Sequence, residues 1–302
     1  MSENVIETQD LTVYYGKHRG IEDVNLSVEK GEVFGFLGPN GAGKTTTQRV
    51  LLDVIRPTSG RATIFGLDCR EKGVEIRQRV GYLPGELALY TNMKADKFFE
   101  MYEYLRPDGG TKGYWRELSQ KLNLDTDRKI REFSRGNKQK VGIVAAFMSR
   151  PNLLILDEPT GGLDPLVQQT VLEMVEEAKA DGRTIFFSSH ILSEVQTVCD
   201  RVGIIRDGRL IETQRVEELI TRRIKRMTLI FPKLPPADAF NLEGVTEVER
   251  SDQKLTLEVK ENLPQVLTTA AQYEVEDIET HSISLEEIFL AYYGKENGGN
   301  HG

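Results

Sequence analysis

Two short stretches carry residues whose types and spacing suit phosphate chemistry. The segment GPNGAGKTT, residues 38–46, follows an apolar run at 33–37 and precedes a helical pattern. It fits G-x-x-x-x-G-K-[ST], a pattern in which backbone N–H groups and a helix N-terminus surround bound phosphates. The residues we expect to bind a nucleotide are Gly38, Pro39, Asn40, Gly41, Ala42, Gly43, Lys44, Thr45 and Thr46.

Within this segment, Lys44 is expected to contact the β- and γ-phosphates, and Thr45 to place its hydroxyl on Mg²⁺. The alternative is a flexible glycine-rich turn with no ligand. The predicted strand before the segment and the predicted helix after it favour the phosphate loop.

The second stretch is LLILDEPTGGLD, residues 153–164, where four apolar residues lead directly into Asp157 and Glu158. Asp157 is predicted to hold Mg²⁺ through water, as the equivalent aspartate of P-loop NTPases does. Glu158 is predicted to orient or deprotonate the attacking water, because general bases lie at such strand ends. The alternative is that Glu158 only caps the segment that follows it.

The elements that must position these residues alternate between strand and helix up to about residue 206. The runs 33–37, 153–156 and 184–190 are typical of strands buried on both faces, which favours an α/β fold with a mostly parallel sheet. Asp207 and Gly208 predict a hairpin turn within VGIIRDGRLI. The segments 94–106 and 114–124 have apolar residues at helical spacing, so residues 86–145 are predicted to form an inserted helical subdomain.

The residue pattern changes after about residue 215, so we expect a large α/β domain over 1–215 and a small α+β domain over 216–302. Strands are predicted at 227–231, 245–250 and 254–259, and helices at 264–272 and 284–294. The last helix would begin with an S-x-x-E capping box, Ser284 and Glu287. The glycine-rich tail that follows is expected to be disordered.

Composition limits the function classes. The net charge of −8 argues against a broad basic face for nucleic acid, so no nucleic-acid partner is expected. Only two cysteines occur, Cys69 and Cys199, which suggests a reducing compartment and unreactive thiols. No apolar stretch is long enough to span a bilayer, so any membrane-spanning part would belong to another chain.

Taken in order, these motifs resemble those of the ATP-binding subunits of ABC transporters over about residues 5–215. FSRGNKQKV, residues 133–141, resembles the family signature LSGGQ and keeps Ser134 and Gly136. Three of its positions depart from the signature, Phe133, Arg135 and Asn137. LLILDEP and GGLD resemble the second nucleotide motif and the loop that crosses to the partner subunit, although Gly161 stands where Ser is usual.

The resemblance implies roles for single residues. Tyr15 would stack on adenine, with neighbouring Tyr14 as the rival, and His190 would contact the γ-phosphate. Glu158 occupies the catalytic-base position, so the implied catalytic residues are Glu158, His190 and Lys44. The implied cofactors are ATP and Mg²⁺.

The resemblance also implies a dimer, either a homodimer or a heterodimer with a similar subunit. The signature residues that would close over ATP bound by the opposite copy are Ser134, Arg135, Gly136 and Asn137. Asp164 would lie in the loop that crosses to the partner. Read without the family, Ser134 is a helix N-cap, which is the simpler alternative.

A membrane-embedded permease is the other implied partner, contacted through residues 86–106, which would place the protein on the cytoplasmic face of the membrane. The family usually has Gln after VGYLP, where it touches Mg²⁺; here Gly85 takes that position and Glu86 follows. Glu86 is therefore a metal-ligand candidate, and an ordinary surface residue is the alternative.

Three stretches resemble ABC-2 type exporters, which include drug and antibiotic efflux systems. They are VGYLPGE, the SRG of the signature and SLEEIFLAYYG. The function that follows is a motor subunit driving export. A soluble ABC-type ATPase with a regulatory or nucleic-acid role is the alternative. The segment between Lys44 and Ser134 disfavours it, because it holds no heptad run for the long coiled coil of chromosome-maintenance ATPases.

Overall fold

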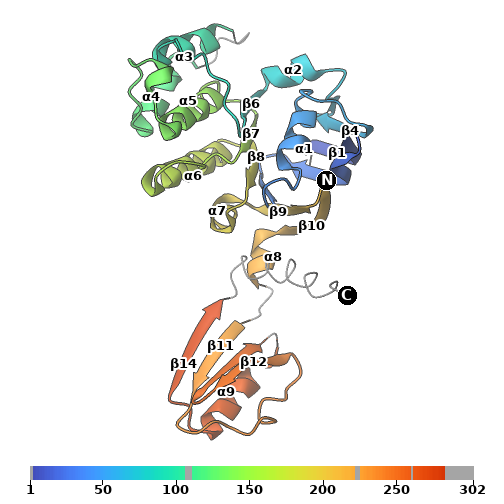
Figure 1. Ribbon diagram of the computed structural model, residues 1–302, viewed down its shortest axis with the longest axis vertical. Helices are drawn as coiled ribbons and strands as arrows, with labels where there is room; N and C mark the ends of the chain where they lie inside the picture. Colours follow the sequence, from blue (N-terminus) through green and yellow to red (C-terminus); the bar gives the residue numbers. More distant parts are fainter. Residues whose placement is uncertain (1–2, 106–110, 222–224, 260, 283–302) are drawn as a thin grey trace. The chain divides into compact units, whose positions relative to one another are not determined.

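The computed structural model describes residues 3–105, 111–221, 225–259 and 261–282 (Figure 1). The chain divides into two compact units, Met1–Val216 and Glu217–Gly302. The first unit contains both stretches that the sequence singles out for phosphate chemistry, and the second has a sheet of its own.

A six-stranded sheet with the order β10-β9-β3-β8-β7-β6 forms the centre of the first unit. Its neighbouring strands are parallel, except that β10 is antiparallel to β9. Every residue of β3, β7 and β8 is buried, as expected for strands covered on both faces, so the predicted α/β fold is confirmed. The strands are β3 (Val33–Leu37), β6 (Val80–Leu83), β7 (Leu153–Asp157), β8 (Thr184–Ser189), β9 (Arg201–Arg206) and β10 (Arg209–Arg215).

The parallel arrangement places the carboxyl ends of β3, β7 and β8 at one edge of this sheet. At this edge the glycine-rich segment follows β3, Glu158 follows β7 and His190 follows β8. The chain then continues into α1 (Lys44–Leu51), α6 (Pro165–Ala180) and α7 (Leu192–Val198), respectively. This edge is where an open α/β sheet binds its ligands.

The turn between β9 and β10 is the hairpin that the sequence predicts. Asp207 and Gly208 have φ values of 47° and 77°, in the left-handed region that Asp and Gly tolerate in such turns.

An antiparallel sheet at the N-terminus was not expected from the sequence. Its strand order is β2-β1-β4-β5, and β1 and β2 pair along most of their length. One apolar core, which includes Val24, Phe34 and Ile205, joins it to the parallel sheet. The strands are β1 (Asn4–Tyr15), β2 (His18–Glu29), β4 (Ser59–Ile64) and β5 (Leu67–Asp68).

Helices dominate the segment between β6 and β7, and α3, α4 and α5 cluster together in Figure 1. Phe99 and Trp115 are buried at their centre with ring centroids 5.4 Å apart, so the predicted helices around 94–106 and 114–124 are confirmed. The helical elements between β5 and β7 are α2 (Gly73–Gln78), α3 (Ala95–Tyr104), α4 (Tyr114–Lys121), the 3₁₀ turn η1 (Ile130–Glu132) and α5 (Arg135–Phe147). None of the helices in the described part of the chain has the length and apolar character that a membrane span requires.

The second unit is an antiparallel sheet with the order β12-β13-β11-β14. Leu229, Leu257 and Val266 are among the residues of its core. The sequence predicts three of the strands and the helix, but it misses β14, whose residues DIETHS show little apolar alternation. The elements are α8 (Val216–Thr221), β11 (Lys225–Ile230), β12 (Val245–Ser251), β13 (Lys254–Val259), α9 (Leu263–Gln272) and β14 (Asp277–Ser282). The helix predicted at 284–294 and the tail after it lie outside the described residues.

Candidate functional site

Two glycines of the segment at 38–46, Gly38 and Gly43, have no room for a Cβ atom. A Cβ at Gly38 would lie 2.4 Å from the carbonyl oxygen of Ile205. A Cβ at Gly43 would lie 2.6 Å from Cγ2 of Ile21, and Gly43 has a φ of 110°. No side chain caps the helix that starts at Lys44, so its first N–H groups remain available to an anion.

Lys44 crosses this loop. Its Nζ donates to the carbonyl oxygens of Gly38 and Pro39 at 2.6 and 3.1 Å, and the side chain is only 5% exposed. The ammonium group is therefore fixed at the centre of the loop, beside the uncapped start of α1.

Asp157, the last residue of β7, joins the loop to the neighbouring strands. Its Oδ2 accepts a hydrogen bond from Thr45 Oγ1 at 2.7 Å, and its Oδ1 accepts one from Ser188 Oγ at 2.6 Å. A threonine hydroxyl beside a carboxylate is an oxygen donor set that suits Mg²⁺. Burial, and then the charge of Asp157, raise the pKa of nearby Tyr82 to about 12.

Glu158 has a backbone that redirects its side chain away from Asp157. Its φ is 50°, which is unfavourable for a residue with a Cβ, and strain of this kind clusters at functional sites. Its Oε1 lies 3.3 Å from Nζ of Lys44 and 3.1 Å from Nδ1 of His190. The cap of the next helix is Asp164, which accepts from the N–H of Val167, so the capping alternative for Glu158 is wrong.

His190 follows β8 directly and keeps 45% of its side chain exposed while it contacts Glu158. The structure therefore forms two sets of side-chain contacts at this edge: Thr45 with Asp157, and Glu158 with both Lys44 and His190. The two sets adjoin because Lys44 precedes Thr45, and Asp157 precedes Glu158, in the chain. They come from the ends of three adjacent parallel strands, which sequence spacing alone does not reveal.

The two tyrosines at the end of β1 have different surroundings. The hydroxyl of Tyr14 donates to Glu22 at 3.0 Å. The hydroxyl of Tyr15 lies 3.4 Å from Oγ1 of Thr46, and its ring is 48% exposed. Tyr15 is therefore the tyrosine with a contact to the phosphate loop.

We define the signature-like segment as residues Ser134–Asn137, at the start of α5. The Oγ of Ser134 accepts from the N–H of Asn137 at 3.2 Å, which confirms the predicted N-cap. A Cβ at Gly136 would lie 3.0 Å from the carbonyl oxygen of Gly162, so this segment packs on the loop that ends in Asp164. Within the described part of the chain, no hydrogen bond from the segment reaches the phosphate loop of the same molecule.

Gly85, the second residue after β6, lies next to the Asp157 carboxylate. A Cβ there would lie 3.0 Å from Asp157 Oδ2, whereas Glu86 is an exposed residue. The bare backbone of Gly85, rather than a side chain, thus borders this carboxylate.

Two residues that hold the site were not identified from the sequence. Ser188 donates to Asp157, as described above. The amide of Gln139, on α5, donates to the carbonyl oxygens of Glu158 and Pro159 at 3.3 and 3.2 Å. The sequence does contain a sign of the role of Gln139, because this polar residue stands on the face of the predicted helix that is otherwise buried and apolar.

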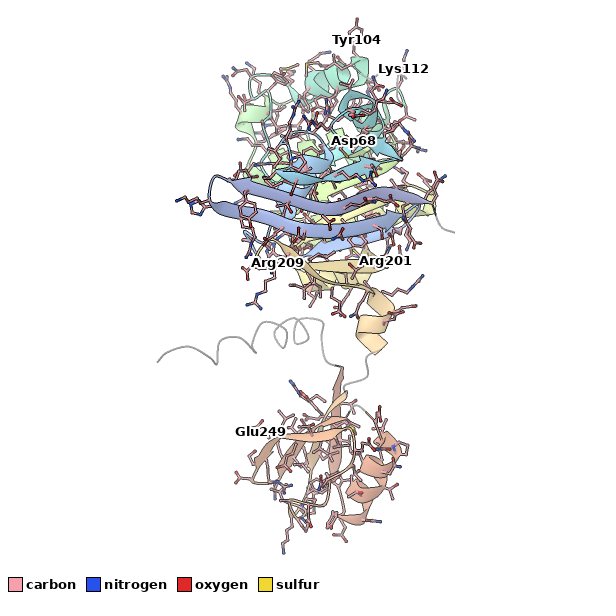
Figure 2. All side chains as sticks on the ribbon, turned by 90° about the vertical axis from the view of Figure 1, so that its right-hand side faces the viewer. Asp68, Tyr104, Lys112, Arg201, Arg209 and Glu249 are labelled. Carbon is pink, nitrogen blue, oxygen red and sulfur yellow. The ribbon has the colours of Figure 1, made fainter. Side chains whose placement is uncertain are left out.

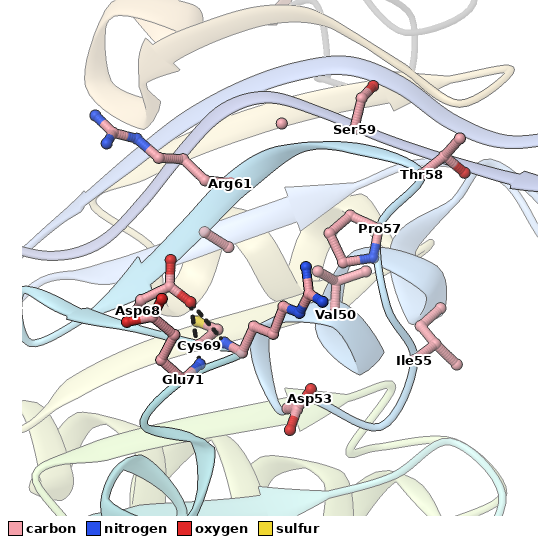
Figure 3. A pocket seen from close by; sticks show the side chains of 13 residues that line it. Val50, Asp53, Ile55, Pro57, Thr58, Ser59, Arg61, Asp68, Cys69 and Glu71 are labelled. Carbon is pink, nitrogen blue, oxygen red and sulfur yellow. Dashed lines mark hydrogen bonds between the residues drawn. The ribbon is translucent and has the colours of Figure 1, made fainter.

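A separate cavity of about 640 Å³ lies between the end of α1 and strands β4 and β5 (Figure 3). Asp68 accepts there from the backbone N–H groups of Arg70 and Glu71 at 2.9 and 3.2 Å. Burial, and then Asp68 and Asp53, raise the pKa of the Cys69 thiol to about 12. The thiol therefore stays protonated at neutral pH, in line with the unreactive thiol that the sequence predicts.

Comparison with protein families gives two matches. The family model described as ABC transporter matches residues 21–161. A second model, described as the C-terminal domain of DrrA1-3-like ATP-binding proteins, matches residues 218–293. The bacitracin transport ATP-binding protein BcrA of Bacillus licheniformis is 39% identical over 229 residues, which cover 73% of each chain.

Solved structures show the same fold. A structure described as an ATP binding subunit of an ABC transporter superposes with a TM-score of 0.66 at 30% identity, covering 71% of this chain and 91% of the other. A dimeric ATP-binding cassette in a post-hydrolysis state, bound to ADP and Pi, has a TM-score of 0.64 at 21% identity and covers 70% and 98%.

Proposed function

The chain belongs to the ABC transporter family of ATP-binding proteins, and from this premise we propose that it hydrolyses ATP to drive a separate membrane-spanning subunit. One observation carries the proposal. Two adjoining sets of contacts, Thr45 with Asp157 and Glu158 with Lys44 and His190, lie at the carboxyl edge of three parallel strands. These are the groups that binding and cleavage of a triphosphate need.

Nucleotide binding is assigned to the backbone of residues 38–46 and to Lys44. The loop N–H groups and the start of α1 would surround the phosphates, and Lys44 would neutralise the β- and γ-oxygens. Tyr15, exposed beside Thr46, supports stacking on the adenine.

Thr45 and Asp157 would hold Mg²⁺, because their oxygens already converge at 2.7 Å and Ser188 orients the carboxylate. When bound, the ion would neutralise charge on the phosphate oxygens. Gly85 borders Asp157 in place of a side chain, so we assign no ligand to position 85 or to the exposed Glu86.

Glu158 is proposed as the general base. Its carboxylate has different partners from that of Asp157, so one carboxylate is assigned to the metal and the other to the attacking water. His190 holds the Glu158 carboxylate through Nδ1 and presents the rest of its exposed ring toward the γ-phosphate.

We propose that two copies, or this chain and a similar subunit, close over two ATP molecules. The exposure of Ser134 and Arg135 supports this, because the start of α5 can reach an anion held by another molecule. The solved cassette with ADP and Pi is described as dimeric, in agreement with such an arrangement. Asp164, exposed at the start of α6, would lie in the same contact.

Residues 86–106 are proposed to contact the membrane subunit on the cytoplasmic face. Exposed aromatic side chains support this surface: Tyr90 is 62% exposed, and Tyr104, which projects outward in Figure 2, is 89% exposed. Phe98 packs against Tyr90 and Tyr102, with ring centroids 6.3 and 4.8 Å apart, so the aromatic surface is held by the helical core. Exposed aromatics of this kind are enriched in protein interfaces.

An antibiotic or drug is the cargo class we propose, with outward transport. The support is the name of the bacitracin transport relative and the match of residues 218–293 to the DrrA1-3-like C-terminal domain.

The test compares the full-length chain with Glu158→Gln in ATP and Mg²⁺. Turnover should fall by about 10²- to 10⁴-fold, while ATP binding persists and size exclusion shows an ATP-dependent dimer. Glu176→Gln makes the same chemical change on the exposed face of α6 and should leave turnover unchanged. Wild-type turnover in Glu158→Gln would remove this residue from the base role. No ATP turnover by the unaltered chain, alone or with its membrane partner, would refute the function.

A further inference from the structure

Glu194 is a buried carboxylate for which the proposed mechanism has no role. It lies in α7 with 6% exposure, and both of its oxygens accept hydrogen bonds. Oε1 accepts from Thr160 Oγ1 at 2.5 Å, and Oε2 accepts from Ser189 Oγ at 2.7 Å.

One hydroxyl donor, Thr160, lies in the loop that carries the candidate base, and the other, Ser189, is the last residue of β8, directly before the histidine. Thr160 follows Glu158 by two residues and is 2% exposed. Ser189 immediately precedes His190, is also 2% exposed, and accepts from the N–H of Ile191 at 2.9 Å. One carboxylate therefore links the loop after β7 to the end of β8.

The Glu194 hydrogen bonds add to those of the sheet. A backbone bond joins the two segments from Glu158 N–H to the Ser188 carbonyl at 3.1 Å. The 3.1 Å side-chain contact between Glu158 and His190 lies beyond this bond, so it depends on how the residues after β7 and β8 are held. A buried carboxylate with two hydroxyl donors holds both donors in place, because breaking either hydrogen bond leaves a buried polar group unpaired.

We propose that Glu194 is a positioning residue for hydrolysis, which fixes Glu158 and His190 relative to the phosphate loop through Thr160 and Ser189. The proposal rests on the proposed ATPase function. It predicts that loss of the Glu194 carboxylate impairs the chemical step and spares nucleotide binding, because Lys44 and the phosphate loop make no contact with it.

The experiment measures kcat and KM for ATP of the full-length chain carrying Glu194→Ala, Glu194→Gln or Thr160→Val. In Glu194→Ala, kcat should fall by about 10- to 100-fold with KM within about threefold, since small misplacement of a catalytic group costs this much. Glu194→Gln should stay within about fivefold of the wild-type kcat, because an amide can accept from one hydroxyl and donate to the other. Thr160→Val should fall between these two variants.

Glu32→Ala is the matched control for a buried glutamate. Glu32 is 8% exposed and pairs with Arg201 at 3.1 Å, just before the amino end of β3, which is the end away from the phosphate loop. The Glu32→Ala variant should lower the midpoint of thermal unfolding at least as much as Glu194→Ala does. At temperatures well below that midpoint, its kcat should stay within about twofold of the wild-type value.

The two failures are distinguishable. If the wild-type chain turns over ATP and Glu158→Gln stalls, but Glu194→Ala keeps the wild-type kcat, the positioning role of Glu194 is refuted and the ATPase function stands. Equal kcat losses in Glu194→Ala and Glu32→Ala would also refute the positioning role, because they indicate general destabilisation. A wild-type chain without turnover refutes the function on which the proposal rests.

Discussion

Two helix N-termini of the first unit, those of α1 and α5, differ in what surrounds them. The start of α1 has no side-chain cap and is enclosed by the phosphate loop, with Lys44 buried at its centre. The start of α5 is capped by Ser134 and exposed, and its backbone packs on the loop around Gly162. Both ends carry the positive helix dipole, but of the two only the start of α1 holds a buried lysine, whereas Arg135 at the start of α5 is exposed.

This difference indicates that the two helix N-termini have different roles in the proposed dimer. The start of α1, together with Asp157, Glu158 and His190, gathers within one molecule the groups that we propose to bind the triphosphate. The start of α5 offers a hydroxyl and N–H groups that bind no anionic side chain among the residues the structure describes. Substitutions at the first end should therefore affect binding by a monomer, and substitutions at the second should affect only the dimer.

The largest effect is expected from Lys44→Ala. Removing the buried ammonium should weaken ATP binding by about 100-fold or more, because charged hydrogen bonds to phosphate are lost in a desolvated loop. Ser134→Ala should leave the monomer's affinity within about twofold, as measured by calorimetry on the full-length chain at a concentration that keeps it monomeric. Retained affinity in Lys44→Ala would undo the assignment of the phosphate loop.

A mixture of the two variants tests the division directly. Neither Lys44→Ala nor Ser134→Ala should hydrolyse ATP well alone. In a mixed dimer, the intact loop of one copy meets the intact segment of the other, and turnover should exceed either parent by about tenfold. Ser134→Asn keeps the helix cap while it removes the hydroxyl, so it separates lost capping from lost contact across the dimer. Mixtures that stay as inactive as their parents would contradict a site shared between copies.

A smaller effect is expected from two glycine substitutions that form a matched pair. Alanine at Gly85 and alanine at Gly136 would each place a Cβ 3.0 Å from an oxygen, that of Asp157 in the first case and of Gly162 in the second. Gly85→Ala should raise the Mg²⁺ concentration for half-maximal turnover several-fold, because the metal-binding carboxylate must shift. Gly136→Ala should not change this requirement. A titration of turnover against Mg²⁺ that shifts equally in both variants would show that Gly85 has no special relation to the metal.

Much of the fold could be read from the sequence, because several elements have local signals. The buried runs before Gly38 and Asp157, the Asp207–Gly208 turn and the Ser134 cap were all predicted and are present. The N-terminal antiparallel sheet and β14 were not predicted. Their pairing is settled by distant strands, since β1 contacts β4 and β14 contacts β11, and no short window of sequence contains that information.

For the site, the sequence by itself determined the chemical groups: a glycine-rich loop with Lys44 and Thr45, two adjacent carboxylates, and a histidine after a buried strand. Tertiary structure alone decided that Ser188 orients Asp157, that Tyr15 rather than Tyr14 contacts the phosphate loop, and that Glu194 ties Thr160 to Ser189. The physical reason is that local patterns fix backbone conformation and residue type. Which hydroxyl reaches which carboxylate depends on strand order in the sheet and on packing between segments far apart in the chain.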